Sequence, residues 1–202
     1  MKTYTLKKIT GAPNWSTIEV MPIDTLLWTD PLPISAQAQL CWDEEAIYLR
    51  MEAFEKDIRK EETDPLAEIC NDSCLEFFLQ PVDGPYYLNF EINPLCNYLI
   101  GQGDESDVDN RLRVIIPDFE TRMEPKVTFT ETGWVLTYKV PFDFIRHFYP
   151  QFEAKAGTKV RGNCYKCGDL TVNPHFIAWN PVVSDEPAFH VPEYFGQFIF
   201  GE

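Results

Sequence analysis

Alternation of apolar and polar residues over short segments is the feature that most constrains the fold of this chain. Three pairs of such segments are each joined by a short turn-forming stretch, WDEE, PVDGP or ETG, which is the pattern of a β-hairpin. The paired segments are residues 35–42 with 46–53, 73–80 with 86–93, and 126–130 with 134–140. Further strands are expected at 158–166, at 194–200 and, as an edge strand, at 3–9. Short strands separated by turns predict an all-β protein, an antiparallel β-sandwich of the jelly-roll or immunoglobulin-like kind.

Helix signals are scarce. Residues 141–148 (PFDFIRHF) alone predict a short helix, because a proline opens the segment and apolar residues recur at helical spacing. Four prolines interrupt the stretch 161–200, so this part predicts strands and ordered loops. Acidic loops are expected at 55–71 and 101–110, the second being the more mobile. Since no internal repeat or linker divides the chain, residues 1–202 are expected to form a single domain.

The net charge of −15 argues against the classes of protein that need a basic surface. Binding to nucleic acid or to an anionic membrane depends on Lys and Arg clusters, so neither partner is expected. No apolar run approaches a membrane span, and the start MKTYTLKKIT lacks the apolar core of a signal peptide. The protein is expected in the cytoplasm if the chain is complete, and outside it if a signal peptide was removed. Six irregularly spaced cysteines favour free, partly buried thiols.

The second hairpin carries a polar face. A symmetric turn sets its register and places Glu76 directly opposite Glu91. The other facing pairs are Phe78 with Asn89 and Cys74 with Asn93. The apolar face, expected to join the core, holds Leu75, Phe77, Leu79, Leu88, Phe90 and Ile92, and the polar face holds Glu76, Gln80, Asn89, Glu91 and Asn93. Two like charges across a strand pair are destabilising, so an arginine, a bound cation or shifted ionisation should offset them. Arg161 is the expected neutraliser.

This polar face has three interpretations. It is an exposed face with basic neighbours, or a concave surface whose carboxylates and amides bond hydroxyl groups in fixed directions. In an enzymatic version, Glu76 and Glu91 stand roughly 5 Å apart, the separation that retaining glycosidases use. Hydrolysis of aryl glycosides that Glu76→Gln abolishes would distinguish the enzyme from a binding surface.

Cys164 and Cys167 form a C-x-x-C pair, which is half of a zinc site that His175 or His190 could complete. Strand alternation, however, sends the two thiols to opposite faces. No stoichiometric zinc is therefore expected, and the default for these cysteines is a small buried thiol. His175 is expected to be a loop histidine bonded to the backbone, or to line a site beside Trp179.

Several segments in order resemble a known family. They are AQLCWDEEAIYLRMEAFE, DSCLEFFLQP, YLNFEINP, GWVLTYKVPFDFI, AWNP and FG-x-F-x-F. This series resembles the family 9 carbohydrate-binding modules and their relatives among the DOMON-like sandwiches, over about residues 15–200. The resemblance implies a two-sheet β-sandwich that binds sugars and is associated with breakdown of xylan- or cellulose-type polysaccharides. Many relatives also carry structural calcium, which the acidic loops here permit, and no other cofactor is implied.

The resemblance also suggests site residues. In the family, two tryptophans hold the sugar; Trp179 in AWNP matches the later one, and Glu76 matches the glutamate of the D-x-x-E-x-F segment. The region before Asp72 has no aromatic residue, so the sugar sandwich is incomplete unless Trp28 or a tyrosine substitutes. Trp179 is then a stacking platform, although on composition alone it could equally cap the core.

The sequence therefore predicts non-catalytic binding of a mono- or oligosaccharide. Trp179 is expected to stack on the sugar, and Glu76, Asn93, Arg161 and Asn163 to bond its hydroxyls. Arg161 and Asn163 share a side-chain direction on their strand. The alternatives are a glycoside hydrolase that uses Glu76 and Glu91, and a zinc-stapled interaction module.

Overall fold

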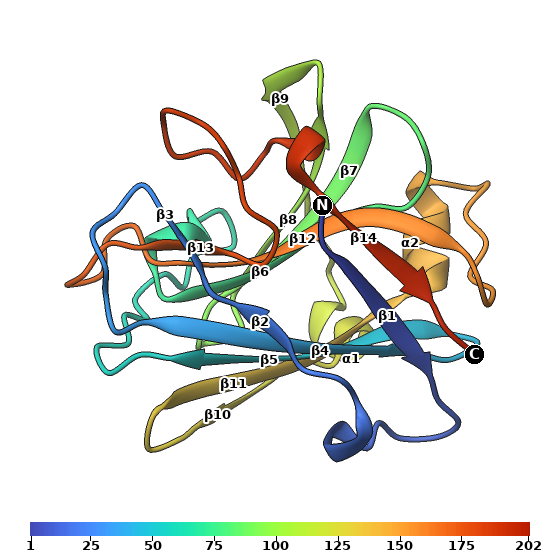
Figure 1. Cartoon of the computed structure of the whole chain (residues 1–202), viewed down its shortest axis with the longest axis horizontal. Helices are drawn as coiled ribbons and strands as arrows, with labels where there is room; N and C mark the ends of the chain where they lie inside the picture. The colour runs from blue at the N-terminus through green and yellow to red at the C-terminus, as the bar shows by residue number, and fades with distance from the viewer.

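Over the described backbone, the chain folds into fourteen strands that curl as one mainly antiparallel sheet around a core, with two short α-helices. The computed structural model describes the backbone throughout and the side chains of residues 1–107 and 110–202. The sheet doubles back on itself to form two layers, which Figure 1 shows as a lower and an upper set of strands. The predicted all-β antiparallel sandwich is thereby confirmed.

The lower layer contains the first and third predicted hairpins. Its strands, in spatial order, are β10 (Lys126–Phe129), β11 (Gly133–Pro141), β5 (Ala46–Phe54), β4 (Ser35–Trp42) and β1 (Thr3–Lys8), with β2 (Met21–Ile23) beside β4. The upper layer continues with β14 (Gly196–Phe200), β12 (Lys159–Cys167), β6 (Cys74–Gln80), β7 (Tyr86–Ile92), β8 (Tyr98–Asp104) and β9 (Asp107–Val114). Two further strands, β13 (Phe176–Ala178) and β3 (Thr25–Leu27), extend it from β12.

Strand β1 joins the two layers. Its first four residues pair in parallel with β14, and its last two residues pair in parallel with β4. The expectation of an edge strand at residues 3–9 is therefore wrong. A strand that lies between two others in the sheet order is not an edge strand, and local alternation carries no information about such long-range pairing.

The helices are short. The predicted helix at 141–148 is confirmed as α2 (Phe142–Phe148), which buries Phe142, Phe144 and Ile145 against the core. No sequence pattern predicted α1 (Phe119–Met123), which is five residues long and is held by burial of Phe119 and Met123. Three 3₁₀ turns complete the set: η1 (Trp15–Thr17), η2 (Ile69–Asn71) and η3 (Pro192–Tyr194). Among the described residues, none of these helices has the length and apolar character needed to cross a membrane.

The acidic stretch 101–110 is not the loop expected from its composition. It belongs to the hairpin of β8 and β9, which adds two strands to the edge of β7. Gly101 and Gly103 lie where this hairpin meets β7, because a Cβ atom at either position would come within 2.5 Å of the side chain of Asn89 or Tyr87. The glycines thus allow close approach of two strands and are not a turn signal. The side chains of residues 108 and 109 lie outside the described part.

The core lies between the two layers, and the second hairpin has the predicted register. Glu76 pairs with Glu91 and Phe78 with Asn89. The apolar face of this hairpin, from Leu75 to Ile92, is buried in the main core as expected. A second apolar cluster lies on the opposite face of the upper layer, where the 180–195 segment packs against Phe78, Tyr87 and Tyr165. The upper layer is therefore covered on both faces.

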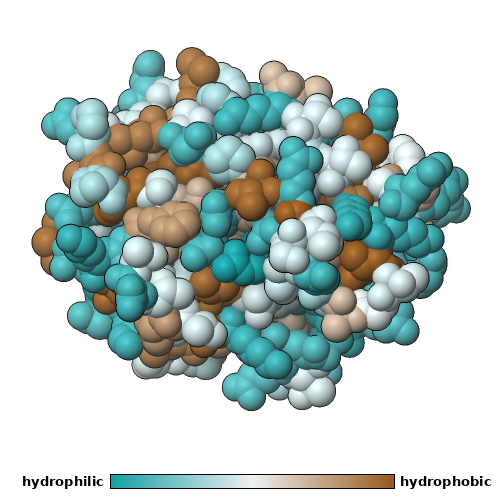
Figure 2. All heavy atoms as spheres, turned by 60° about the horizontal axis from the view of Figure 1, so that its bottom comes forward, coloured by the Kyte–Doolittle hydropathy of each residue, from teal (hydrophilic) through white to brown (hydrophobic). Residues whose placement is uncertain are grey.

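Hydrophilic residues cover most of the face seen in Figure 2, and apolar residues appear on it in small scattered groups. Scattered exposed apolar residues are normal on a folded protein and need no separate explanation.

Candidate functional site

A cavity of about 640 Å³ opens on the outer face of the upper layer. Its floor is formed by the polar face of β6 and β7, the face that the sequence singled out. Glu76, Asn89 and Glu91 line it, and Cys167 joins them from β12. Gly101 of β8 leaves room for the Asn89 side chain at this point. The volume lies in the usual range for a small-molecule site.

Aromatic residues form one wall. Phe176 comes from β13, and Phe189 and His190 come from the 180–195 segment. The Phe189 ring stacks on Tyr165 with centroids 4.0 Å apart, and Trp28 lies behind both phenylalanines at 5.8 Å from Phe176 and 6.0 Å from Phe189. These contacts fix the orientation of the wall, so it can present ring surface to a ligand without losing side-chain entropy.

The opposite wall comes from β9, whose Arg111 and Arg113 line the cavity. Arg113 pairs across the ladder with Gly101, and its guanidinium donates to the carbonyl oxygens of Leu66 and Ala67 at 2.9 and 2.7 Å. Arg113 therefore ties the 62–68 loop to β9, whereas Arg111 is exposed at the rim.

The two carboxylates at the floor are deeply buried, with Glu76 2% and Glu91 5% exposed. Burial raises the pKa of Glu76 well above its usual value, and the neighbouring Glu91 raises it further. Burial likewise raises the pKa of Glu91 to about 7. Because the two groups titrate together, the pair keeps at least one proton near neutral pH. Of the three compensations expected for this pair, the structure supports shifted ionisation.

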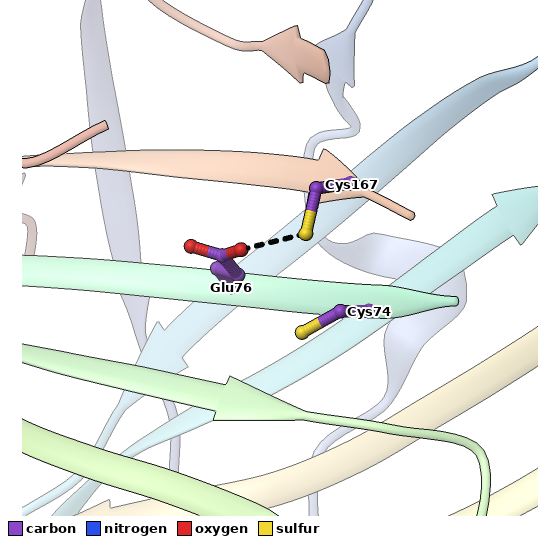
Figure 3. A group of neighbouring side chains, drawn as sticks. All are labelled: Cys74, Glu76 and Cys167. Carbon is purple, nitrogen blue, oxygen red and sulfur yellow. Dashed lines mark hydrogen bonds between the residues drawn. The ribbon is translucent and has the colours of Figure 1, made fainter. Parts of the chain in front are cut away.

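Among the described residues, each carboxylate accepts one side-chain hydrogen bond, and the donor is neutral. The Cys167 thiol donates to Oε1 of Glu76 at 2.9 Å, as the dashed line in Figure 3 shows, and the Asn89 amide donates to Oε1 of Glu91 at 2.9 Å. The Asn89 side chain is 1% exposed, and its Oδ1 atom has no partner among the described residues. The buried Oδ1 of Asp169, another residue of the cavity, is also without one. Unpaired buried acceptors are costly, so these atoms favour a ligand that donates hydrogen bonds.

Arg161 does not neutralise the carboxylate pair, contrary to expectation. It faces Gln80, whereas Glu76 faces Tyr165, four positions further along β12 and so about 13 Å away. The Arg161 guanidinium instead donates to Oε1 of Gln80 and to the carbonyl oxygen of Pro192. Its role in the structure is to hold the 180–195 segment.

Trp179 lies in the core and is 3% exposed. Its ring stacks on Phe198 at 4.9 Å and belongs to the main cluster between the layers. Alternation along β13 explains this: Phe176 and Ala178 face the outer cluster, while Ile177 and Trp179 face the core. Of the two roles that the sequence left open for Trp179, the structure fits the core cap, and the aromatic ring at the cavity belongs to Phe176.

Asn93 and Asn163 are fully buried and bonded within the protein. Asn93 donates to Asp72 and to the Glu62 carbonyl oxygen, and it accepts from the backbone of Leu95 and Asn97. Asn163 donates to the Asn180 carbonyl oxygen and accepts from the Asn180 amide. Both amides fix loops, and neither lines the cavity. Of the five residues that the sequence put forward, Glu76 alone belongs to it.

The C-x-x-C thiols point to opposite faces, as alternation predicts: Cys164 lies in the core and Cys167 in the outer cluster. Cys167 does meet Cys74 and Glu76, whose ligand atoms all lie within 4.8 Å of one another (Figure 3). This group has the atoms to hold a thiophilic metal ion. Burial, however, raises the pKa of both thiols and so opposes the thiolate that a metal requires.

The two histidines considered as further ligands are both engaged. His175 Nδ1 donates to the Asn173 carbonyl oxygen at 2.7 Å, as expected for a loop histidine, and Nε2 accepts from Lys166 at 2.6 Å. Lys166 also pairs with Glu55 at 3.2 Å inside the protein. His190 shares a hydrogen bond with the Tyr87 hydroxyl at 2.9 Å. The ligand set of a zinc-stapled module is therefore not assembled around Cys164 and Cys167.

A curled antiparallel sandwich whose outer face carries a pocket with an aromatic wall and a buried polar floor is a small-ligand-binding domain. Comparison with known families identifies the chain as a member of carbohydrate-binding family 9, which matches residues 12–200.

Solved structures agree with this assignment. A candidate carbohydrate-binding protein from Bacteroides uniformis is 25% identical, with a TM-score of 0.82 over 98% of this chain and 99% of that one. A family 9 carbohydrate-binding module from Caldicellulosiruptor kristjanssonii, solved with glucose, is 12% identical, with a TM-score of 0.66 over 100% of this chain and 97% of that one. Its complex with cellotriose gives 11% identity and the same TM-score, over 99% and 94%. No curated protein matches the sequence.

The sequence reasoning missed most of the cavity. It placed Asn89 and Glu91 on the polar face but left both out of the sugar-binding set, and it named Glu91 only for the enzymatic alternative. It passed over Phe176, Phe189 and Arg111. Alternation through residues 176–179 (FIAW) could have identified Phe176 as a residue of the outer face, because Trp179 and Phe176 must point to opposite faces. The other two lie on segments that approach β6 and β7 only through long-range folding.

Proposed function

We propose that this protein binds a mono- or oligosaccharide in the outer-face pocket without acting on it chemically. The binding contributes to polysaccharide catabolism. The observation that carries the proposal is the combination at one cavity of buried, unpaired hydrogen-bond acceptors with a fixed aromatic wall. A sugar presents hydroxyl donors at its edge and C–H groups on its face, so it satisfies both surfaces at once.

In this proposal Glu76, Asn89 and Glu91 bond the hydroxyls, and Phe176 with Phe189 contacts the apolar face of the ring. Phe176 takes the platform role first expected of Trp179. Trp179, Asn93, Asn163 and Arg161 act indirectly, by fixing β13 and the loops around the pocket. The complexes of the Caldicellulosiruptor kristjanssonii module with glucose and cellotriose support a glucose-type ligand.

The test is calorimetric titration of the whole chain with glucose, xylose and cello-oligosaccharides, comparing the parent with Phe176→Ala. Loss of the ring should weaken binding about tenfold or more, because one stacking residue dominates the contacts of a small polar ligand. Phe176 is only partly buried, so the melting temperature should change little. Trp28, 5.8 Å from Phe176, should report binding through its fluorescence.

The matched control is Phe129→Ala on β10, where the ring is 49% exposed and lies on the other layer. It should bind like the parent. Equal affinity of Phe176→Ala and the parent would show that the aromatic wall is not the sugar platform.

A further inference from the structure

We propose that the pocket prefers a sugar that carries a free, protonated amine, an amino sugar of the glucosamine type, over the neutral sugar of the same shape. This inference rests on the proposed function and names the ligand class of the same pocket.

The two buried carboxylates, Glu76 and Glu91, lack a direct cationic partner in the part of the chain that the structure describes. The ion pairs formed by the described residues include neither Glu76 nor Glu91. The hydrogen bonds that they accept come from neutral groups, the Cys167 thiol and the Asn89 amide. Two carboxylates directly across a strand pair repel each other, and a cation between them would remove that repulsion.

The nearby basic groups are engaged or peripheral: Arg111 and Arg113 lower the pKa of Glu91 somewhat, but neither forms an ion pair with it. Arg113 is held by the Leu66 and Ala67 carbonyl oxygens, and Arg111 is exposed at the rim. Burial lowers the pKa of His190 to about 3, so this ring is neutral. Lys166 projects from the other face of β12 and binds Glu55.

The remaining titratable groups of the cavity add no positive charge. Glu68 and Asp169 are acidic, and burial raises the pKa of the Cys70 and Cys167 thiols, so both stay neutral. The floor of the cavity therefore offers negative charge without an ion-pair partner among the described residues.

The unpaired acceptors at the floor favour an amine independently of its charge. The nearly inaccessible Asn89 lines the floor, and its Oδ1 atom lacks a partner among the described residues, as does Oδ1 of Asp169. An ammonium group has three N–H donors and no acceptor, whereas a hydroxyl supplies one donor and also acceptors to be satisfied. A floor that consists mainly of acceptors matches the ammonium more completely.

The bound amine would take the place of the proton that the carboxylate pair now holds. Its positive charge lowers the pKa of both carboxylates in the complex, so binding releases protons to the buffer. The affinity for the amine should therefore rise with pH. At pH values below the pKa of Glu91, where the free pocket still holds its proton, the rise is up to about tenfold per pH unit. A neutral sugar does not produce this rise.

The experiment is titration calorimetry of the whole chain with glucosamine hydrochloride, glucose and N-acetylglucosamine. It is run from about pH 5 to about pH 7, in two buffers of different ionisation enthalpy that together give the number of protons released. Glucosamine should bind about tenfold or more tightly than glucose near neutral pH and should release protons. This advantage should shrink at the acidic end.

Glu91→Gln should reduce the ratio of glucosamine to glucose affinity and the number of protons released with glucosamine, because the amide keeps an acceptor but not the charge. Glu131→Gln, an exposed glutamate in the turn between β10 and β11, is the matched control and should behave like the parent. Glu91→Gln removes a repelling charge and should not impair folding, which the melting temperature of the variant checks.

Equal or tighter binding of glucose, or glucosamine binding without proton release, would overturn this inference and leave the proposed function standing. Absence of binding by every sugar, including the cello-oligosaccharides, would overturn both.

Discussion

The carboxylate pair makes a quantitative prediction about stability. The pKa of Glu91 rises from an ordinary value of 4.5 to about 7 in the folded protein, with burial as the main cause. Below the unfolded pKa both states are protonated, and Glu91 has no effect on the free energy of unfolding. Between the unfolded and the folded pKa of Glu91, the folded state keeps a proton that the unfolded state has lost, so the free energy of unfolding falls as pH rises. Above the folded pKa, the ionised Glu91 lowers the free energy of unfolding by its full amount, about 3 kcal/mol.

Glu91→Gln removes this cost and keeps an acceptor for the Asn89 amide. The variant should therefore be more stable than the parent by about 3 kcal/mol near pH 8, and equally stable near pH 4. Urea unfolding across this range measures the difference directly. Glu131→Gln makes the same change of net charge at an exposed site and should follow the parent at every pH. A Glu91→Gln protein with parental stability near pH 8 would refute a strained, buried carboxylate pair.

Three further predictions follow from individual contacts. Trp179→Ala should lose about 3–5 kcal/mol of stability, because the ring fills the core against Phe198, and a small loss in urea unfolding would contradict a core position. Gly101→Ala should weaken sugar binding about tenfold or more with the fold retained, because its Cβ would lie 2.5 Å from Asn89 Oδ1 and displace that acceptor; calorimetry at parental affinity would argue against Asn89 as a ligand residue. Elemental analysis of the purified protein should find no stoichiometric zinc, since Cys164 and Cys167 face opposite ways; about one zinc per chain with sulfur ligation would contradict this.

Local alternation was enough to predict much of the fold. The three hairpins and the pairing of Glu76 with Glu91 follow from period-two patterns and a symmetric turn, both of which are local. The position of β1 between β14 and β4 could not be predicted in this way, because it depends on which strands become neighbours. The β8–β9 hairpin was missed because its glycine, aspartate and serine residues are typical of loops.

The site was harder to predict than the fold, because most of its residues are brought together by long-range contacts. Glu76 was found because it lies on a regular strand with a repelling neighbour. The role of Arg161 was wrong because charge alone does not say how far along a ladder two residues meet, and the register places it at Gln80. Phe189 and Arg111 reach the cavity only when distant segments fold over β6 and β7.

The most direct test of the central claim is a sugar titration of the isotope-labelled chain followed by amide chemical shifts. Glucosamine, glucose or cellotriose should shift the amide signals of Asn89, Gly101, Phe176 and Phe189 around the cavity and leave those of β10 and β11 unchanged. Shifts confined to another face, or no shifts with any of the three sugars, would contradict that claim.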